Sequence, residues 1–146
     1  MTNWNNVEGF EPWEFEDPLL PGSGDEINGE TLLLLVGFRT HLVRRKLATG
    51  IIVTSAVDLY GAHGHSKASY HLLSKGCRAV DFFLLTQMSK RQQIHEFLKV
   101  GFTGAGVYFD WKHKGKPITV GFHGDTRPVN ESILWRRNLN RYTYFI

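Results

Sequence analysis

The sequence has a single cysteine, Cys77, among its 146 residues. One thiol excludes an intrachain disulfide and a cysteine-based zinc knuckle, so a metal site would have to use histidine and carboxylate side chains. Long hydrophobic runs are also missing: the longest, from Leu32 to Val36 with Gly37 and Phe38 following, is far shorter than a membrane span. The start of the chain has neither the basic residues nor the apolar stretch of a secretory signal. We therefore expect no membrane span and no signal peptide.

Basic residues are absent from the first 30 positions. That segment has eight Asp and Glu and no Lys or Arg, whereas residues 31–126 have 13 basic and 5 acidic side chains. The net charge of +3 therefore combines an acidic arm with a basic body. Two interpretations stay open: the arm folds over the body and neutralises it, or the basic surface binds a polyanion such as nucleic acid or a cell-wall polymer.

The overall composition is that of an ordinary folded domain. Hydrophobic residues are 42% and charged residues 21%, which excludes disordered, collagen-like and coiled-coil classes. The length predicts a single domain over residues 1–146. Residues 1–24 predict an irregular acidic arm, and residues 128–146 a basic, aromatic tail that fits an edge strand or a packed tail. The aromatic residues that we expect to hold the arm are Trp4, Phe10, Trp13 and Phe15.

Two helices are predicted from capping signals. Asn28 can cap a helix that runs to about Ala48, where Thr49-Gly50 supplies a stop. Ser89 followed by Gln92 is a capping-box pattern that opens a second helix, ending at Gly101.

Short apolar runs predict strands at residues 51–54, 79–84, 106–109 and 118–122, of which the last two form a β-hairpin. Residues 55–78 predict a long loop rich in Gly, Ser and His, and such a loop within a compact domain is more often functional than idle. The predicted fold class is α+β, a small and mostly antiparallel sheet packed against two or more helices.

One carboxylate stands within an apolar strand. Asp81 is flanked by Ala79-Val80 and Phe82-Phe83, where an unpaired carboxylate would cost several kcal/mol. It must therefore find a metal, a cation or hydrogen bonds, and Arg78 or Arg39 would be the simple partner.

Histidines gather near this carboxylate. His63, His65 and His71 lie in the loop before its strand, and His123 closes the last predicted strand. The strands can bring His71, Asp81 and His123 together, and two His with one Asp leave an open fourth position on a tetrahedral zinc ion, as catalytic sites do. The alternative is that these are ordinary histidines with satisfied hydrogen bonds.

Four ordered motifs resemble those of the zinc D-Ala-D-Ala carboxypeptidase and endopeptidase superfamily, which cuts peptidoglycan peptides. Residues 69–82 resemble its S-x-H-x-x-G-x-A-x-D signature, and residues 122–127 its closing H-x-D-x-R element. Residues 52–55 are similar to its I-T-S-G strand, and residues 101–108 to its G-F-x-x-x-G-V-Y segment. The resemblance spans about residues 30–127 and implies the fold that this superfamily shares with the hedgehog signalling domain.

The resemblance implies roles for individual residues. The ligands of one Zn²⁺ per chain would be His71, Asp81 and His123. Asp125 would either orient a ligand histidine by a hydrogen bond, without binding the metal itself, or serve as the general base. His65, six positions before the first ligand, would stabilise the transition state. Asp110 is the preferred general base, because the hedgehog-like pattern has a Glu there. The residues expected to bind substrate are Arg127, Tyr108 and Ser69.

Three departures from the family pattern are visible. His71 and Asp81 are ten positions apart where the signature has seven, so three extra residues, expected within 73–77, must bulge out. The family's Ser-Gly-Tyr-Arg, whose Arg grips the substrate carboxylate, is Ser55-Ala56-Val57-Asp58. Residues 117–122 contain no acid, although many relatives place the general base there.

By this resemblance the chain is a zinc metallopeptidase of peptidoglycan stems or crosslinks, a D,D-carboxypeptidase or an endolysin-like endopeptidase. Family members of this size without a signal peptide are commonly bacteriophage proteins. The resemblance therefore implies a chain made in the host cytoplasm, which reaches the cell wall after holin-type release or within a virion beside other virion proteins. The alternative is an inactive, zinc-binding relative that is a structural or binding part of a virion. A nucleic-acid module, suggested by three arginines interleaved with aromatic residues in 135–144, is disfavoured because a packed tail strand explains them equally well.

Overall fold

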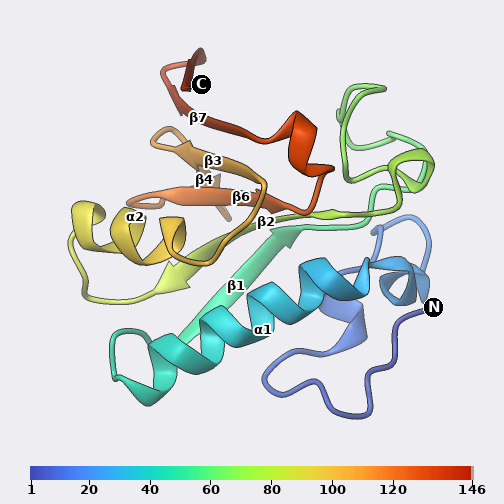
Figure 1. The fold of residues 1–146 in the computed structure, drawn as a ribbon, viewed down its shortest axis with the longest axis horizontal. Coiled ribbons are helices and arrows are strands. Elements are labelled where there is room, and N and C mark those ends of the chain that lie inside the picture. The colour runs from blue at the N-terminus through green and yellow to red at the C-terminus, as the bar shows by residue number, and fades with distance from the viewer. Residues whose placement is uncertain (146) are drawn as a thin grey trace.

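The computed structural model describes residues 1–145 (Figure 1). Its centre is a six-stranded sheet of order β1-β2-β6-β3-β7-β8, in which only the β3–β7 pair is parallel. The strands are β1 (Gly50–Ser55), β2 (Ala79–Leu85), β3 (Gly104–Tyr108), β6 (Gly121–Asp125), β7 (Ile133–Asn138) and β8 (Arg141–Phe145). The predicted α+β class with a mostly antiparallel sheet is confirmed. None of the helices within residues 1–145 has the length and hydropathy needed to cross a membrane.

Both predicted helices are present. Helix α1 (Gly29–Arg44) begins where Asn28 accepts hydrogen bonds from two backbone N–H groups of its first turn. It ends four residues before the predicted Ala48, because Lys46 takes a left-handed φ of 57° that a helix cannot continue through. Helix α2 (Lys90–Leu98) opens with the predicted capping box of Ser89 and Gln92.

The predicted hairpin strands are neighbours, but the connection between them is more elaborate. β3 and β6 pair antiparallel, and β6 begins at Gly121 rather than at residue 118. The intervening chain forms a second, two-stranded hairpin of β4 (Lys112–His113) and β5 (Lys116–Pro117). The tail takes the edge-strand form, in which β7 lies beside β3 and β8 closes the sheet.

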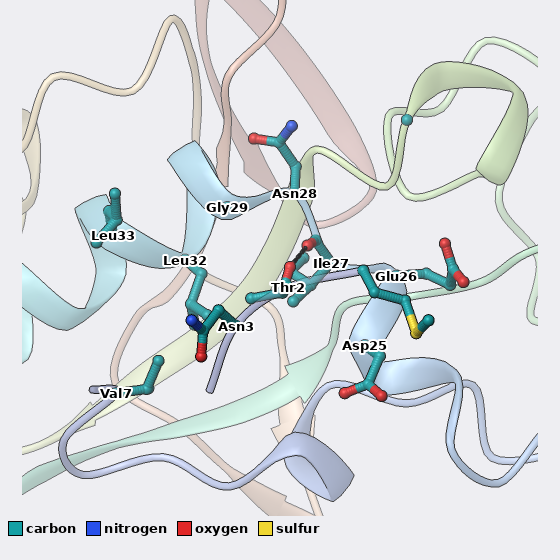
Figure 2. A pocket seen from close by; sticks show the side chains of 12 residues that line it. Thr2, Asn3, Val7, Asp25, Glu26, Ile27, Asn28, Gly29, Leu32 and Leu33 are labelled. Carbon is teal, nitrogen blue, oxygen red and sulfur yellow. Dashed lines mark hydrogen bonds between the residues drawn. The ribbon is translucent and has the colours of Figure 1, made fainter. Parts of the chain in front are cut away.

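The N-terminal arm is irregular apart from the short 3-10 turns η1 (Pro12–Glu14) and η2 (Ser23–Glu26). Phe10 and Phe15 are buried in the core, as expected of aromatic residues that hold an arm. Trp13 is 68% exposed, so its prediction as a holding residue is wrong. The start of the arm folds back on η2: the backbone N–H of Thr2 donates to the Asp25 carbonyl (2.8 Å), beside a cavity of about 460 Å³ shown in Figure 2.

The two faces of the sheet are different in chemistry. The helices cover one face, where Phe82 meets Phe38 of α1 and Phe97 of α2 with ring centroids 6.2 and 5.9 Å apart. The opposite face carries a row of six residues that pair across all six strands. In sheet order, these residues are Ser55, Asp81, His123, Gly106, Trp135 and Tyr144. The polar side chains of interest thus share one face, away from the helices.

The two faces predict that neighbouring phenylalanines contribute unequally to the free energy of unfolding. Phe82→Ala removes a fully buried side chain, and we expect it to lower the free energy of unfolding by about 3–5 kcal/mol. Phe83→Ala, on the other face, is the matched control, and we expect less than half that loss. Urea denaturation of both variants measures the difference; equal losses would contradict this assignment of the core.

Candidate metal centre

His71, Asp81 and His123 converge on the open face of the sheet. Asp81 of β2 pairs directly with His123 of β6, and His71 reaches them from the loop before β2. His71 Nε2 lies 3.3 Å from Asp81 Oδ1, His123 Nδ1 lies 2.7 Å from the same oxygen, and the two nitrogens are 3.4 Å apart. Ligand atoms on one tetrahedral zinc ion lie about 3.3 Å from one another. The three atoms are therefore close enough to bind a single metal ion.

The longer spacing between His71 and Asp81 is absorbed by a bulge. The chain between them turns through η3 (Leu73–Lys75) and then through two left-handed residues, Gly76 (φ 82°) and Cys77 (φ 47°). A hydrogen bond from the Cys77 N–H to the Leu72 carbonyl (3.0 Å) closes this turn. The turn lies within residues 73–77, where the bulge is expected, and both side chains reach the cluster.

His71 is held in one orientation. Its side chain is buried, and Nδ1 donates to the carbonyl oxygen of Ala56 at 2.5 Å. A carbonyl can only accept, so the proton of the neutral ring is on Nδ1 and the lone pair is on Nε2. Nε2 is the atom that faces Asp81.

His123 lies between two carboxylates. Its Nε2 is 2.8 Å from Asp125 Oδ2, and its Nδ1 faces Asp81. Burial alone would lower the pKa of His123, but the hydrogen bonds to Asp125 and Asp81 raise it to about 9. Asp125 therefore contacts His123, a candidate metal ligand, in the way expected of a residue that orients its ring. Gly104 makes room for it, because a Cβ there would lie 2.2 Å from Asp125 Oδ1.

The sequence predicts that Arg127 binds substrate, whereas in the structure its guanidinium pairs with Asp125. Its guanidinium binds Asp125 through two bonds, Nε to Oδ1 (2.8 Å) and Nη2 to Oδ2 (2.6 Å), and lies 4.8 Å from the ring centroid of Tyr70. Burial of the Asp125 carboxyl opposes ionisation, but Arg127 and His123 hold its pKa well below the usual range. Although Arg127 borders the cavity beside the cluster, its fork is occupied by Asp125.

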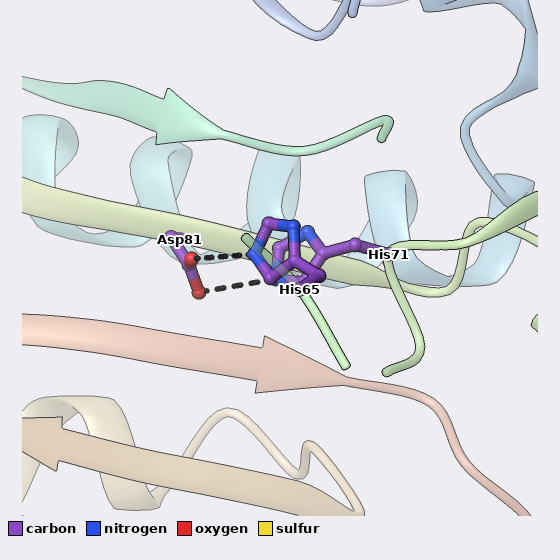
Figure 3. A group of neighbouring side chains, drawn as sticks. All are labelled: His65, His71 and Asp81. Carbon is purple, nitrogen blue, oxygen red and sulfur yellow. Dashed lines mark ion pairs between the residues drawn. The ribbon is translucent and has the colours of Figure 1, made fainter. Parts of the chain in front are cut away.

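His65 lies against the cluster as a second layer. Its ring stacks on that of His71 with centroids 4.0 Å apart and planes at 17°, and its Nε2 lies 3.9 Å from Asp81 Oδ2 (Figure 3). Its Nδ1 is 2.7 Å from Oδ2 of Asp58, whose side chain is only 1% exposed. Because ligand atoms of His65, His71 and Asp81 all lie within 4.8 Å of one another, His65 can also reach a metal ion held there.

Asp58 is the site residue whose role the sequence did not reveal. In the sequence it is an acid where the resembled family has an arginine, which indicates only that the arginine's contact with the substrate carboxylate is missing. Here the carboxylate binds His65 and also accepts from the backbone N–H of His63 (3.2 Å). Nearby, His63 Nε2 pairs with Asp17 Oδ1 of the arm at 2.6 Å, so the arm contributes an acid to this second layer.

The remaining predicted residues are distributed unevenly. Ser69 and Tyr108 border the cavity beside the cluster, and the Tyr108 hydroxyl accepts a hydrogen bond from Trp135 Nε1 at 2.9 Å. Asp110 is not brought to the cluster: its Oδ2 accepts from the Asn140 N–H (3.0 Å) and lies 3.3 Å from Arg137 Nε. Asp110 is not among the described residues that line the cavity beside the cluster.

The cavity beside the cluster has a volume of about 1220 Å³. Its lining includes the acids Glu14 and Glu16 of the arm and the bases Lys112, Lys114 and Arg137. A cavity of this size that is lined by both acids and bases suits an extended ligand that carries both charges. No protein-family model, curated protein or solved structure matches this chain.

A divalent transition-metal ion such as Zn²⁺ should stabilise the folded chain. At a hundredfold excess over its dissociation constant we expect Tm to rise by about 5–10 °C, because the three ligand atoms converge in the folded chain and are apart in the unfolded one. His71→Ala should abolish this rise, and His95→Ala, at an exposed histidine of α2, should keep it. Differential scanning fluorimetry measures both; an equal rise in His71→Ala would show that the ion binds elsewhere.

Proposed function

We propose that this chain is a zinc metallopeptidase that hydrolyses the peptide stems or crosslinks of bacterial peptidoglycan. The observation that supports it most is the convergence of His71, Asp81 and His123 within 3.4 Å of one another, in spite of their altered spacing. A donor set of two imidazoles and one carboxylate suits Zn²⁺ and leaves a fourth position for water or substrate. We also infer the hedgehog-type fold, since Asp81 and His123 lie on neighbouring strands and His71 lies in the histidine-rich loop before β2.

A bound Zn²⁺ would supply Lewis acidity, which would polarise the scissile carbonyl of the substrate and let a bound water ionise near neutral pH. The protein residues set the geometry around it. Ala56 fixes the Nδ1 proton of His71, and Asp125 fixes the ring of His123 while Arg127 holds Asp125. These contacts keep both imidazoles oriented without reorganisation during the reaction.

His65 is placed to stabilise developing negative charge. Asp58 binds its Nδ1, which leaves Nε2 facing the cluster. Burial alone would lower the pKa of His65, but hydrogen bonds to Asp81 and Asp58 raise it, which favours the ring as a proton donor at Nε2. A donor at this atom would stabilise the oxyanion of a tetrahedral intermediate.

The biological setting follows from the resemblance. A peptidoglycan peptidase of this kind would act in bacteriophage lysis, released by a holin-type pore, or act in a virion with other virion proteins as partners. The cavity lining has both acidic and basic side chains, which is compatible with stem peptides because they have both free amines and free carboxylates.

A catalytically inactive zinc protein of a virion is the second candidate. Two observations favour it: Asp58 replaces the family's carboxylate-binding arginine, and Arg127 is already paired with Asp125. A relative that had lost hydrolysis could keep the metal as a structural element and the cavity as a binding surface.

Zinc content and turnover together separate the two candidates. After dialysis against a weak chelator, elemental mass spectrometry should find about one zinc per chain, absent from His71→Ala and His123→Ala. The zinc-loaded chain should release new amino groups from purified peptidoglycan. Zinc without hydrolysis of peptidoglycan or of synthetic stem peptides would favour the virion protein, and failure to bind zinc at all would exclude both.

Two variants test the catalytic roles. Asp110→Asn should abolish turnover if Asp110 is the general base, and His65→Ala should lower kcat by about 10²-fold or more through loss of a proton donor. Both should keep their zinc. Full activity in Asp110→Asn would agree with its pairing to Arg137 and remove it as the base, whereas zinc loss in His65→Ala would make His65 a ligand.

A further inference from the structure

The open face of the sheet continues from the metal centre to the outer edge as a surface of aromatic rings. In the row of Asp81 and His123, the next side chains are Trp135 of β7 and Tyr144 of β8. In the neighbouring row, Tyr108 of β3 is followed by Arg137 and Tyr142. Gly106 lies beneath Trp135, where a Cβ would come within 2.5 Å of the indole. We call Trp111, Tyr108, Trp135, Tyr142 and Tyr144 the aromatic platform.

Four of these rings form a continuous series of contacts, in which Tyr108 is buried, as is Trp135 beside it, and the two tyrosines of β8 are exposed. Trp111 stacks on Tyr108 with centroids 4.3 Å apart, Tyr108 meets Tyr142 edge-on at 6.4 Å, and Tyr142 and Tyr144 are parallel within 10° at 6.1 Å. The inner end borders the cavity of the metal centre, and Trp135 lies 5.1 Å from His123. The outer end is open, since Tyr142 is 49% and Tyr144 57% exposed.

We propose that the aromatic platform binds the glycan strand of peptidoglycan while a stem peptide occupies the metal centre. This inference rests on the proposed function. A stem peptide is attached to its glycan, so a substrate that reaches the metal brings sugar rings to a neighbouring surface. The C–H faces of hexose rings stack on aromatic faces, and parallel exposed tyrosines two positions apart on one strand offer successive faces to an extended polymer.

The charges near the platform favour a sugar polymer over a nucleic acid. Both arginines that contact its rings already face carboxylates: Arg137 lies 3.3 Å from Asp110, and Arg127 binds Asp125. Glu14 and Glu16 of the arm also line the cavity, together with Lys112 and Lys114. A strand with one phosphate per nucleotide would meet these acids and two arginines that are already paired, with the two lysines as its remaining cations, whereas N-acetylated sugars bring no charge of their own.

Binding of chitotetraose, a soluble tetramer of N-acetylglucosamine, by the full-length zinc-loaded chain tests the proposal. Isothermal titration calorimetry should detect binding that falls about tenfold in Tyr144→Ala and further in the Tyr142→Ala/Tyr144→Ala double variant. Phe145→Ala is the matched control, because Phe145 is on the same strand and 45% exposed but faces the other way, and it should bind as the unaltered chain does. Co-sedimentation with purified sacculi should show the same order.

Three outcomes would overturn the proposal. These are no detectable binding of chitotetraose or sacculi, equal losses in Tyr144→Ala and Phe145→Ala, or tighter, salt-dependent binding of a single-stranded oligonucleotide that the tyrosine variants weaken. The proposed function is tested separately by zinc content and by hydrolysis of a glycan-free stem peptide by the unaltered chain. Hydrolysis without glycan binding refutes the platform alone, and glycan binding without zinc or hydrolysis refutes the peptidase alone.

Discussion

The carboxylate of Asp81, whose side chain is only 14% exposed, is the constraint on which the site depends. Its strand must be apolar to form the sheet, yet a carboxylate with so little contact with water requires compensation from the protein. Burial opposes ionisation, but the facing His71 and His123 hold the pKa of Asp81 well below its usual range. The β2–β6 register supplies one histidine directly, and the loop before β2 supplies the other. Neither Arg78 nor Arg39, the simple partners, is used: Arg78 bonds the Thr126 carbonyl and Arg39 lies over Phe10.

The sheet separates stability from chemistry by its faces. Because successive side chains on a strand point to opposite sides, Phe82 enters the core beside Asp81, and Phe122 does so beside His123. The same alternation places three glycines, Gly104, Gly106 and Gly121, on the polar face, where Asp125, Trp135 and Trp111 lie over them. Bulky side chains can therefore cross the sheet surface near the cluster, and the helices on the other face provide the burial that holds the strands in register.

Local signals in the sequence predict both helices and the four central strands, and strand order together with the resemblance predicts the convergence of His71, Asp81 and His123. Caps at Asn28 and Ser89 depend on contacts within one turn, and the expected bulge after His71 follows from counting residues against the resembled signature. What could not be predicted depends on tertiary contacts between distant segments. The partner of Asp58 is set by how the loop folds back, and Asp110 is turned toward Arg137 by the C-terminal hairpin. Trp13 was misjudged because an aromatic residue in an irregular arm gives no periodicity that indicates which side it faces.

Asp58 stands where the resembled superfamily has an arginine that binds the substrate carboxylate, and this difference bears on what the site could recognise. Here Asp58 binds His65, and the nearby guanidinium of Arg127 is bound to Asp125. Under the proposed function, a substrate with a free carboxylate beside the metal would then meet Asp81 and an arginine, Arg127, whose guanidinium is already paired. Under the proposed function this favours cleavage within a crosslink over removal of a terminal residue. Affinity must then come from surfaces away from the metal, where the cavity and the aromatic platform lie.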